Sequence, residues 1–317
     1  MTSTMAGSPP RMERLTWLRA WAAERFPARN AVFFAALYLA GAFVAQASTH
    51  DGAIRLGLRD LAGFGALWAF FLLLRVFDEH KDFEADAVAH PERVLQRGLV
   101  SLDQLEVLGV LAAATTFLVS LWMDAGIGPV TTWWLATISW SGLMAREFFV
   151  RAWLRRHTML YAVTHLLVMP LATGWVVSMA GASPLESPTT RMLLVLAFIS
   201  GLAFEMARKM RAPRDERDGA DSYTRALGVR AAADVLLLVT AAAMAVALLV
   251  TRLTSGATPL IVGIAATLVA ALPLVHFRRR HTTRAAKLVE AGVGVSMLIA
   301  YVSLLTVIAG SRGLEVQ

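Results

Sequence analysis

The chain has 317 residues, of which 57% are hydrophobic and only 17% are charged, and its mean hydropathy is +0.58. About a quarter of the residues of an average soluble domain are charged, so this composition argues against an ordinary water-soluble enzyme. The net charge is +7, and the lack of cysteine excludes disulfides, thiolate metal sites and a catalytic thiol.

Stretches free of Asp, Glu, Lys and Arg divide the chain into nine apolar runs. They are Asn30–His50, Leu61–Leu74, Val107–Met123, Ala125–Ala145, His157–Leu185, Met192–Phe204, Val235–Thr251, Leu253–Phe277 and Ala291–Ser311. A membrane-spanning helix needs about 17–25 mostly apolar residues, and seven of the nine runs are long enough. We therefore predict an all-α, polytopic bundle of nine transmembrane helices. It forms a single domain over residues 30–311, preceded by a cytoplasmic segment over 1–29 and followed by a tail over 312–317.

The first 29 residues lack the apolar core of a cleavable signal peptide. Trp17, Trp21 and Phe26 alternate with arginines in this segment. Such a mixture is typical of a short helix lying at the membrane interface, although a frayed tail fits the same residues.

The basic residues predict the orientation of the chain. If the nine helices alternate from a cytoplasmic N-terminus, cytoplasmic segments hold 25 of the 30 Lys and Arg residues and the other side holds 5. The positive-inside rule then predicts a multi-pass protein with its N-terminus in the cytoplasm, and we expect its membrane to be the bacterial inner membrane. Because this placement accounts for most of the positive charge, we expect a lipid bilayer as partner and no nucleic acid. The sequence implies no obligate protein partner.

Two of the apolar runs, Leu61–Leu74 and Met192–Phe204, are too short to span a membrane alone. Each helix must therefore borrow length from the charged segment that follows it. Ionisable groups at membrane depth usually face a polar cavity or pair with each other. We expect helices 2 and 6 to bring such groups into a cavity facing the cytoplasm, near acidic loops over residues 75–102 and 205–230. The alternative is that these charges snorkel to the interface.

The segment after helix 2 carries Asp78, Asp82 and Asp86, which recur every four residues. On a helix they form one stripe, with neighbouring side chains about 6 Å apart. Mg²⁺ commonly bridges one or two carboxylates to substrate phosphates, so this stripe suits a magnesium site. A solvated helix end is the alternative, although only Lys81 interrupts these acids with a full positive charge.

The segment after helix 6 contains Pro213 and Gly219, which favour a loop or a broken helix. Its carboxylates suit a second metal ion, and its cations suit contacts with phosphate oxygens. These residues are Asp215, Asp218 and Asp221, and Arg208, Lys209 and Arg211, respectively. A surface network of salt bridges is the alternative for this segment.

Two acidic clusters at the mouth of an apolar bundle suit an amphiphile with a diphosphate head and a hydrocarbon tail. Magnesium stabilises diphosphate as a leaving group, and a water-poor cavity protects the resulting allylic carbocation until an acceptor captures it. Such chemistry needs no covalent nucleophile. The sequence contains no GxSxG motif, no phosphate-binding P-loop and no HExxH motif.

This pattern resembles the UbiA family of intramembrane prenyltransferases, which have nine helices and acidic motifs after helices 2 and 6. The family's first motif, N-D-x-x-D-x-x-x-D, aligns with Asp78, Glu79, Asp82 and Asp86, so that Asp replaces Asn and Glu replaces the first Asp. The second motif, D-x-x-x-D, aligns its last Asp with Asp215 but its first with Arg211, which is a departure from the family pattern.

The resemblance implies a Mg²⁺-dependent transfer of a prenyl chain from a prenyl diphosphate to a small acceptor, of the aromatic or quinone-precursor class. It implies catalytic roles for Asp78, Asp82 and Asp215. The implied metal ligands are Asp78, Glu79, Asp82, Asp86, Asp215, Asp218 and Asp221, and the implied diphosphate-binding residues are Arg75, Lys81, Arg208, Lys209 and Arg211.

Two other functions fit parts of the sequence. A membrane transporter is compatible with helices that carry charges, and Asp215-x-x-Asp218-Gly219 resembles the start of the CDP-alcohol phosphotransferase motif, but the later acidic pair of that motif is missing. Aromatic residues suited to stabilising a carbocation are also present, although packing is their commoner role. They are Tyr161, His165, Trp133, Trp134 and Trp140.

Overall fold

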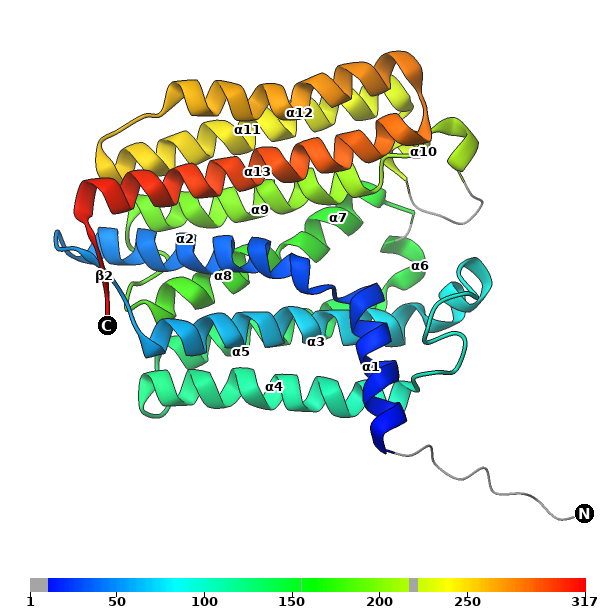
Figure 1. The fold of residues 1–317 in the computed structure, drawn as a ribbon, viewed down its shortest axis with the longest axis horizontal. Helices are drawn as coiled ribbons and strands as arrows, with labels where there is room; N and C mark the ends of the chain where they lie inside the picture. Colours follow the sequence, from blue (N-terminus) through cyan, green and yellow to red (C-terminus); the bar gives the residue numbers. More distant parts are fainter. Residues whose placement is uncertain (1–10, 155, 217–221) are drawn as a thin grey trace, which may run out of the picture.

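The structure, a computed structural model, describes residues 11–154, 156–216 and 222–317. Its long helices run nearly parallel and pack into one bundle (Figure 1). They are α2 (Ala31–Thr49), α3 (Leu58–Ala89), α4 (Leu102–Asp124), α5 (Pro129–Ala145), α8 (Val168–Met179), α9 (Pro188–Arg208), α11 (Val229–Ser255), α12 (Leu260–Arg280) and α13 (Thr283–Arg312). The prediction of an all-α membrane bundle is confirmed.

Short elements lie at the two ends of this bundle (Figure 1). At one end are α1 (Arg11–Arg25), α6 (Arg151–Leu154), α10 (Tyr223–Leu227) and the 3₁₀ helices η1 (Ala28–Asn30), η2 (Glu147–Phe149) and η3 (Pro213–Asp215). The helix α7 (Thr158–Leu166) leads from this end into α8. At the other end are the strands β1 (Ile54–Leu56) and β2 (Leu314–Val316).

Among the described residues, eight helices are long and apolar enough to cross a membrane, with α7 and α8 counted as one segment. Helix α5, with 17 residues, is not among these eight. The strands support a crossing by α5, because β1 and β2 are hydrogen-bonded in parallel. Since β1 follows α2 and β2 follows α13, an even number of crossings must separate them, and α5 makes that number even. Nine crossings and a cytoplasmic N-terminus stay predictions.

Helix α3 is much longer than its apolar run and positions the first acidic segment. Its 32 residues extend over about 48 Å, whereas the hydrocarbon core of a bilayer is about 30 Å thick. The helix stops at His90 because Pro91 disfavours helical backbone at the residue before it. Residues 75–89 are therefore helical, and only the remainder of the expected loop 75–102 is irregular.

The fifth apolar run is broken rather than continuous. Helices α7 and α8 meet at Leu167, and Pro170, which has no N–H, cannot donate to the carbonyl of Leu166. The break lets α7 follow a different direction from α8 at the end of the bundle that carries α1 (Figure 1). Helix α7 thereby brings Tyr161 and His165 towards the charged end of α3.

Helix α1 packs across the same end of the bundle. Trp21 is fully buried and clusters with Val76 of α3 and with Val94, Leu95 and Val100, which precede α4. The prediction of a helix in this segment is confirmed, and the alternative of a frayed tail is wrong for residues 11–25.

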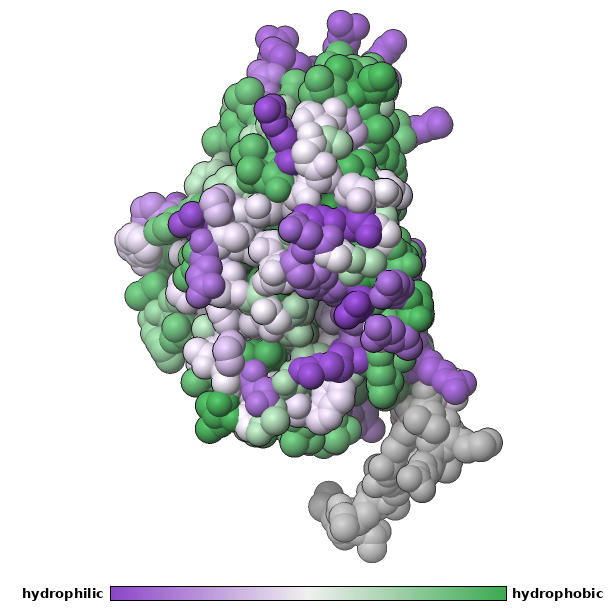
Figure 2. All heavy atoms as spheres, turned by 90° about the vertical axis from the view of Figure 1, so that its left-hand side faces the viewer, coloured by the Kyte–Doolittle hydropathy of each residue, from purple (hydrophilic) through white to green (hydrophobic). Residues whose placement is uncertain are grey.

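The flanks of the bundle carry exposed large apolar side chains, such as Val107 on α4, Leu135 on α5 and Leu238 on α11. Exposed apolar surface of this extent marks contact with a membrane. Figure 2 looks onto the end that carries β1 and β2, where residues of hydrophilic and intermediate hydropathy occupy the middle of the face and hydrophobic residues gather along its edges. This distribution fits an end of the bundle that meets water.

Candidate active site

The site begins on one face of α3, near the end of the bundle that α1 crosses. Lys81 Nζ lies 3.3 Å from Asp78 Oδ1 and 4.0 Å from Asp82 Oδ2, and Arg75 Nη1 lies 3.7 Å from Asp78 Oδ2. Lys81 is 10% exposed, whereas Asp78 and Asp82 are 37% and 38% exposed. Two carboxylates one helical turn apart are thus accessible, while the cation that separates them is largely covered.

The other two acids of the first motif, Glu79 and Asp86, form ion pairs with arginines from other segments. Arg25 of α1 donates from Nε to Oε1 of Glu79 at 2.5 Å, and the Glu79 side chain is completely buried. Asp86 accepts a hydrogen bond from Arg93 and lies 3.7 Å from Arg25 Nη2. Glu79 and Asp86 therefore fasten α1 and the segment after α3, and the structure does not group them with Asp78 and Asp82.

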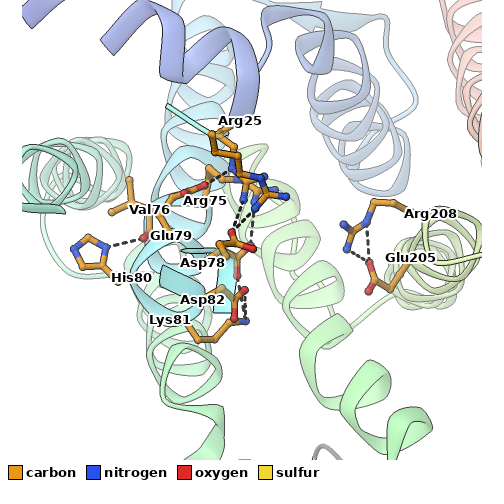
Figure 3. A network of polar contacts seen from close by, with 12 residues as sticks. Arg25, Arg75, Val76, Asp78, Glu79, His80, Lys81, Asp82, Glu205 and Arg208 are labelled. Atoms are coloured by element: carbon orange, nitrogen blue, oxygen red, sulfur yellow. Dashed lines mark hydrogen bonds and ion pairs between the residues drawn. The ribbon is translucent and has the colours of Figure 1, made fainter. Parts of the chain in front are cut away.

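A second charged group lies at the end of α9, opposite the face of α3 (Figure 3). Glu205 pairs with Arg208 at 2.7 Å and with Lys209 at 2.8 Å. The two cations stand at the C-terminus of α9, where the helix dipole favours positive charge. His80 points away from this space in Figure 3, because its Nδ1 lies 2.9 Å from the carbonyl oxygen of Val76.

Tyr161 on α7 links the two charged groups. Lys81 Nζ lies 3.5 Å from the Tyr161 hydroxyl, and Lys209 Nζ lies 5.6 Å from the centre of the Tyr161 ring. A cation at that distance over an aromatic ring is attracted by the ring's quadrupole. One aromatic side chain thus contacts a lysine from α3 and a lysine from α9, and the three helices α3, α7 and α9 meet here.

The second acidic segment is only partly described. The guanidinium of Arg211 donates to the carbonyl oxygens of Arg208 and Met210, so it caps the end of α9. Asp215 lies in η3 and is 3.9 Å from Arg214. Asp218 and Asp221 lie outside the described residues. In the part that is described, the structure does not join Asp215 to the carboxylates of α3.

The acids of the α3 face suit magnesium by their chemistry. Asp78 and Asp82 offer hard carboxylate oxygens, which Mg²⁺ prefers. No group of three or more His, Asp or Glu residues in residues 11–154, 156–216 and 222–317 is arranged to hold a metal ion by itself. Magnesium is usually held by one or two carboxylates together with substrate phosphates and water, so these residues fit an ion that enters with its substrate.

Sequence reasoning missed Arg25 and did not single out Tyr161. Arg25 had no recognisable signal, because nothing in its spacing shows that α1 folds back onto α3. Tyr161 was only one of several aromatic candidates. Of the three tryptophans proposed with it, Trp134 donates to Thr116 and Trp133 packs against Gly174, so both serve packing. A separate cavity of about 490 Å³ beside β1 and β2 has almost wholly apolar walls and lies at the opposite end of the bundle.

Comparison with known proteins identifies the family. The model of the UbiA prenyltransferase family matches residues 31–300, which is most of the chain. The chain belongs to the UbiA prenyltransferase family. Members transfer prenyl groups, so the prediction of a membrane-embedded prenyltransferase is confirmed, and family membership argues against the transporter and the CDP-alcohol phosphotransferase.

Two solved structures share the fold of this UbiA family member. One, described as a digeranylgeranylglyceryl phosphate synthase in membranes, is 13% identical with a TM-score of 0.64, covering 93% of this chain and 99% of that one. The other, the apo structure of a UbiA homolog from Aeropyrum pernix K1, is 15% identical with a TM-score of 0.60, covering 86% of this chain and 98% of that one. No curated protein sequence matches the chain.

Proposed function

We propose that this prenyltransferase moves an isoprenoid chain from a prenyl diphosphate to a small aromatic or quinone-precursor acceptor, with Mg²⁺ as cofactor and its site facing the cytoplasm. One observation carries the proposal. The accessible carboxylates of Asp78 and Asp82 face the cations at the end of α9, at one end of a bundle whose interior is apolar. This arrangement suits an anionic head group joined to a hydrocarbon tail.

The cations are the groups that would bind the diphosphate. Arg75 and Lys81 come from α3, and Arg208 and Lys209 come from α9, so positive charge reaches the space between the helices from two sides. Hydrogen bonds between such cations and phosphate oxygens are charge-assisted and about twice as strong as neutral ones. Lys81 is held by Asp78 and by Tyr161, and Lys209 by Glu205, so both lysines are positioned before substrate arrives.

Departure of the diphosphate would break the bond between C1 of the prenyl chain and oxygen, and the electron pair would leave with the oxygen. Fixed positive groups stabilise the charge that develops on a leaving group. Magnesium, held by Asp78, Asp82 and the diphosphate, would supply further charge neutralisation when bound.

The proposal assigns different roles to the remaining predicted residues. Glu79 and Asp86 act by positioning, because arginines occupy both. Arg211 acts on the end of α9 rather than on the diphosphate. Asp215 keeps its proposed catalytic role, and Asp218 and Asp221 keep their proposed role as metal ligands, as the family's second motif implies.

The test measures release of diphosphate by purified protein in nanodiscs, with prenyl diphosphates of several lengths, pooled cell extract as the source of acceptor, and either Mg²⁺ or EDTA. Mass spectrometry identifies the prenylated product. We expect Asp78→Ala and Asp82→Ala each to lower the Mg²⁺-dependent rate by about 10²-fold or more, because a carboxylate that would hold Mg²⁺ against the leaving diphosphate is lost.

Glu84→Ala is the matched control, because Glu84 is an exposed acid two residues from Asp82 on the same helix. We expect its rate to equal that of the wild-type protein. Full turnover by both aspartate variants, or turnover that EDTA does not change, would show that the proposed site is wrong.

A further inference from the structure

His165 on α7 belongs to an aromatic cluster directly behind Tyr161, which we call the His165 cluster: Trp140, Phe148, Tyr161 and His165. The Tyr161 and His165 rings are stacked with their centres 3.8 Å apart. Phe148 meets His165 edge-on at 5.8 Å and Trp140 at 5.2 Å. All four side chains are half-buried, so the cluster is neither solvent-exposed nor sealed within the core.

The two nitrogens of His165 differ sharply in their surroundings. Nδ1 lies 2.9 Å from the carbonyl oxygen of Tyr161. Because a carbonyl only accepts, Nδ1 carries the proton of the neutral ring, and Nε2 is left with its lone pair. Nε2 is buried and has no hydrogen-bond partner in the described part of the chain. Buried polar atoms are nearly always paired, so an orphan of this kind calls for an explanation.

The backbone beside the cluster is also unusual. Glu147, Phe148 and Phe149 have φ angles of 46°, 53° and 60°, so three successive residues that are not glycine adopt the left-handed conformation. Left-handed backbone is strained for residues that carry a side chain, and conformations of this kind gather at functional sites. Here the run places Phe148 against His165. Trp140 also holds α7 in place, because its indole nitrogen donates a hydrogen bond to the carbonyl oxygen of Thr164 at 3.0 Å.

We infer that His165 is a further catalytic residue, whose Nε2 takes the proton that the acceptor loses. The inference rests on the proposed function. As C1 of the prenyl chain leaves the diphosphate, an oxygen or carbon atom of the acceptor gives the electron pair of the new bond. The proton on that atom then passes to the lone pair of Nε2. Tyr161 contacts Lys81 through its hydroxyl and His165 through its ring face, so one aromatic side chain connects His165 with the proposed diphosphate site.

The test separates release of diphosphate from transfer to an acceptor. Wild-type protein and His165→Phe in nanodiscs receive geranylgeranyl diphosphate, Mg²⁺ and a defined mixture of phenols, hydroxybenzoates and hydroxynaphthoates. Phenylalanine keeps the stacking on Tyr161 but removes the base. We expect the ratio of prenylated acceptor to free prenyl alcohol to fall by about 10²-fold, as for loss of a general base, while diphosphate release and its KM stay within about twofold.

His157→Phe is the matched control, since His157 makes the same bond to a carbonyl four residues earlier but is exposed. In addition, free imidazole should restore transfer to His165→Ala. An unchanged ratio in His165→Phe overturns the inference, as does a wild-type protein that releases diphosphate but prenylates none of the phenols. An equal fall of release and transfer without imidazole rescue shows a structural role only. If wild-type protein shows no Mg²⁺-dependent release from prenyl diphosphates of any of the lengths tested above, the proposed function itself fails.

Discussion

Glu79 and Asp78 are neighbours in sequence, yet their side chains lie on different faces of α3. Asp78 faces the space between α3 and α9, whereas Glu79 is buried beneath α1 against Arg25. Successive residues of a helix point about 100° apart, so a linear motif cannot keep all its acids on one face. The family motif has Asp at the position of Glu79, and the longer Glu side chain here reaches an arginine instead.

At Glu79 we expect a change of stability and not of metal dependence. Glu79→Ala removes the hydrogen bond from Arg25 Nε, and the loss of such a bond between charged groups costs about 1.5–3 kcal/mol, while Asp86 still lies near the arginine. Thermal unfolding in detergent should show the loss as a lower Tm. Titration of the remaining activity with Mg²⁺ should give the wild-type midpoint, and a midpoint shifted tenfold would instead make Glu79 a metal ligand.

The sequence singles out the charged residues of α3, because charges next to short apolar runs stand out. It could not separate Asp78 and Asp82 from Glu79 and Asp86, since their division depends on Arg25, more than fifty residues earlier. Nor could it rank Tyr161 above Trp133, because both are aromatic residues in apolar runs. The distinction arises only where α7 breaks away from α8 and reaches the lysines.

At the scale of elements, α1 matters because it carries Arg25 to the acidic end of α3. Trp21 anchors it, with its side chain fully buried among residues of α3 and the segment before α4. Trp21→Ala should destabilise the protein by about 3–5 kcal/mol, the range for truncation of a large core aromatic. Trp17→Ala, at a half-buried position of the same helix, should cost less.

The rate of limited trypsin digestion reports whether α1 stays packed against the bundle. We expect Trp21→Ala to speed cleavage at Arg25 and Arg29, because α1 then separates from the bundle and exposes this stretch. Cleavage at the same rate in Trp21→Ala and in the wild-type protein would show that other contacts hold α1 in place.

For the whole molecule, the absence of cysteine makes topology measurable by single substitutions. Ile127, which precedes α5, is 88% exposed, and Val316, which follows α13, is 81% exposed. In intact cells we expect a membrane-impermeant maleimide to label Ile127→Cys and Val316→Cys. Val88→Cys and Phe149→Cys, at exposed positions of the opposite end, should be labelled only after the membrane is opened. Labelling of Phe149→Cys in intact cells would mean that α5 does not cross.

The bundle as a whole was predictable because apolar runs and basic segments are properties of the local sequence. Departures from the prediction occur where distant segments meet. The tail over 312–317 contains a strand, since Leu314 pairs with Ile54, a residue near the other end of the sequence. The fifth run bends at Leu167, where a proline in its middle removes a helical hydrogen bond.

The pairing of β1 with β2 also orders events in time. Arg55 and Glu315, which form an ion pair at 3.1 Å across these strands, are 260 residues apart. During synthesis, β1 has no strand to pair with until the ribosome has made the chain from α3 to α13. Contacts between such distant residues bear the largest entropy of loop closure and tend to form late. The two strands therefore pair only after the last helix has entered the membrane, so the pairing of β1 with β2 is a late step in the assembly of the bundle.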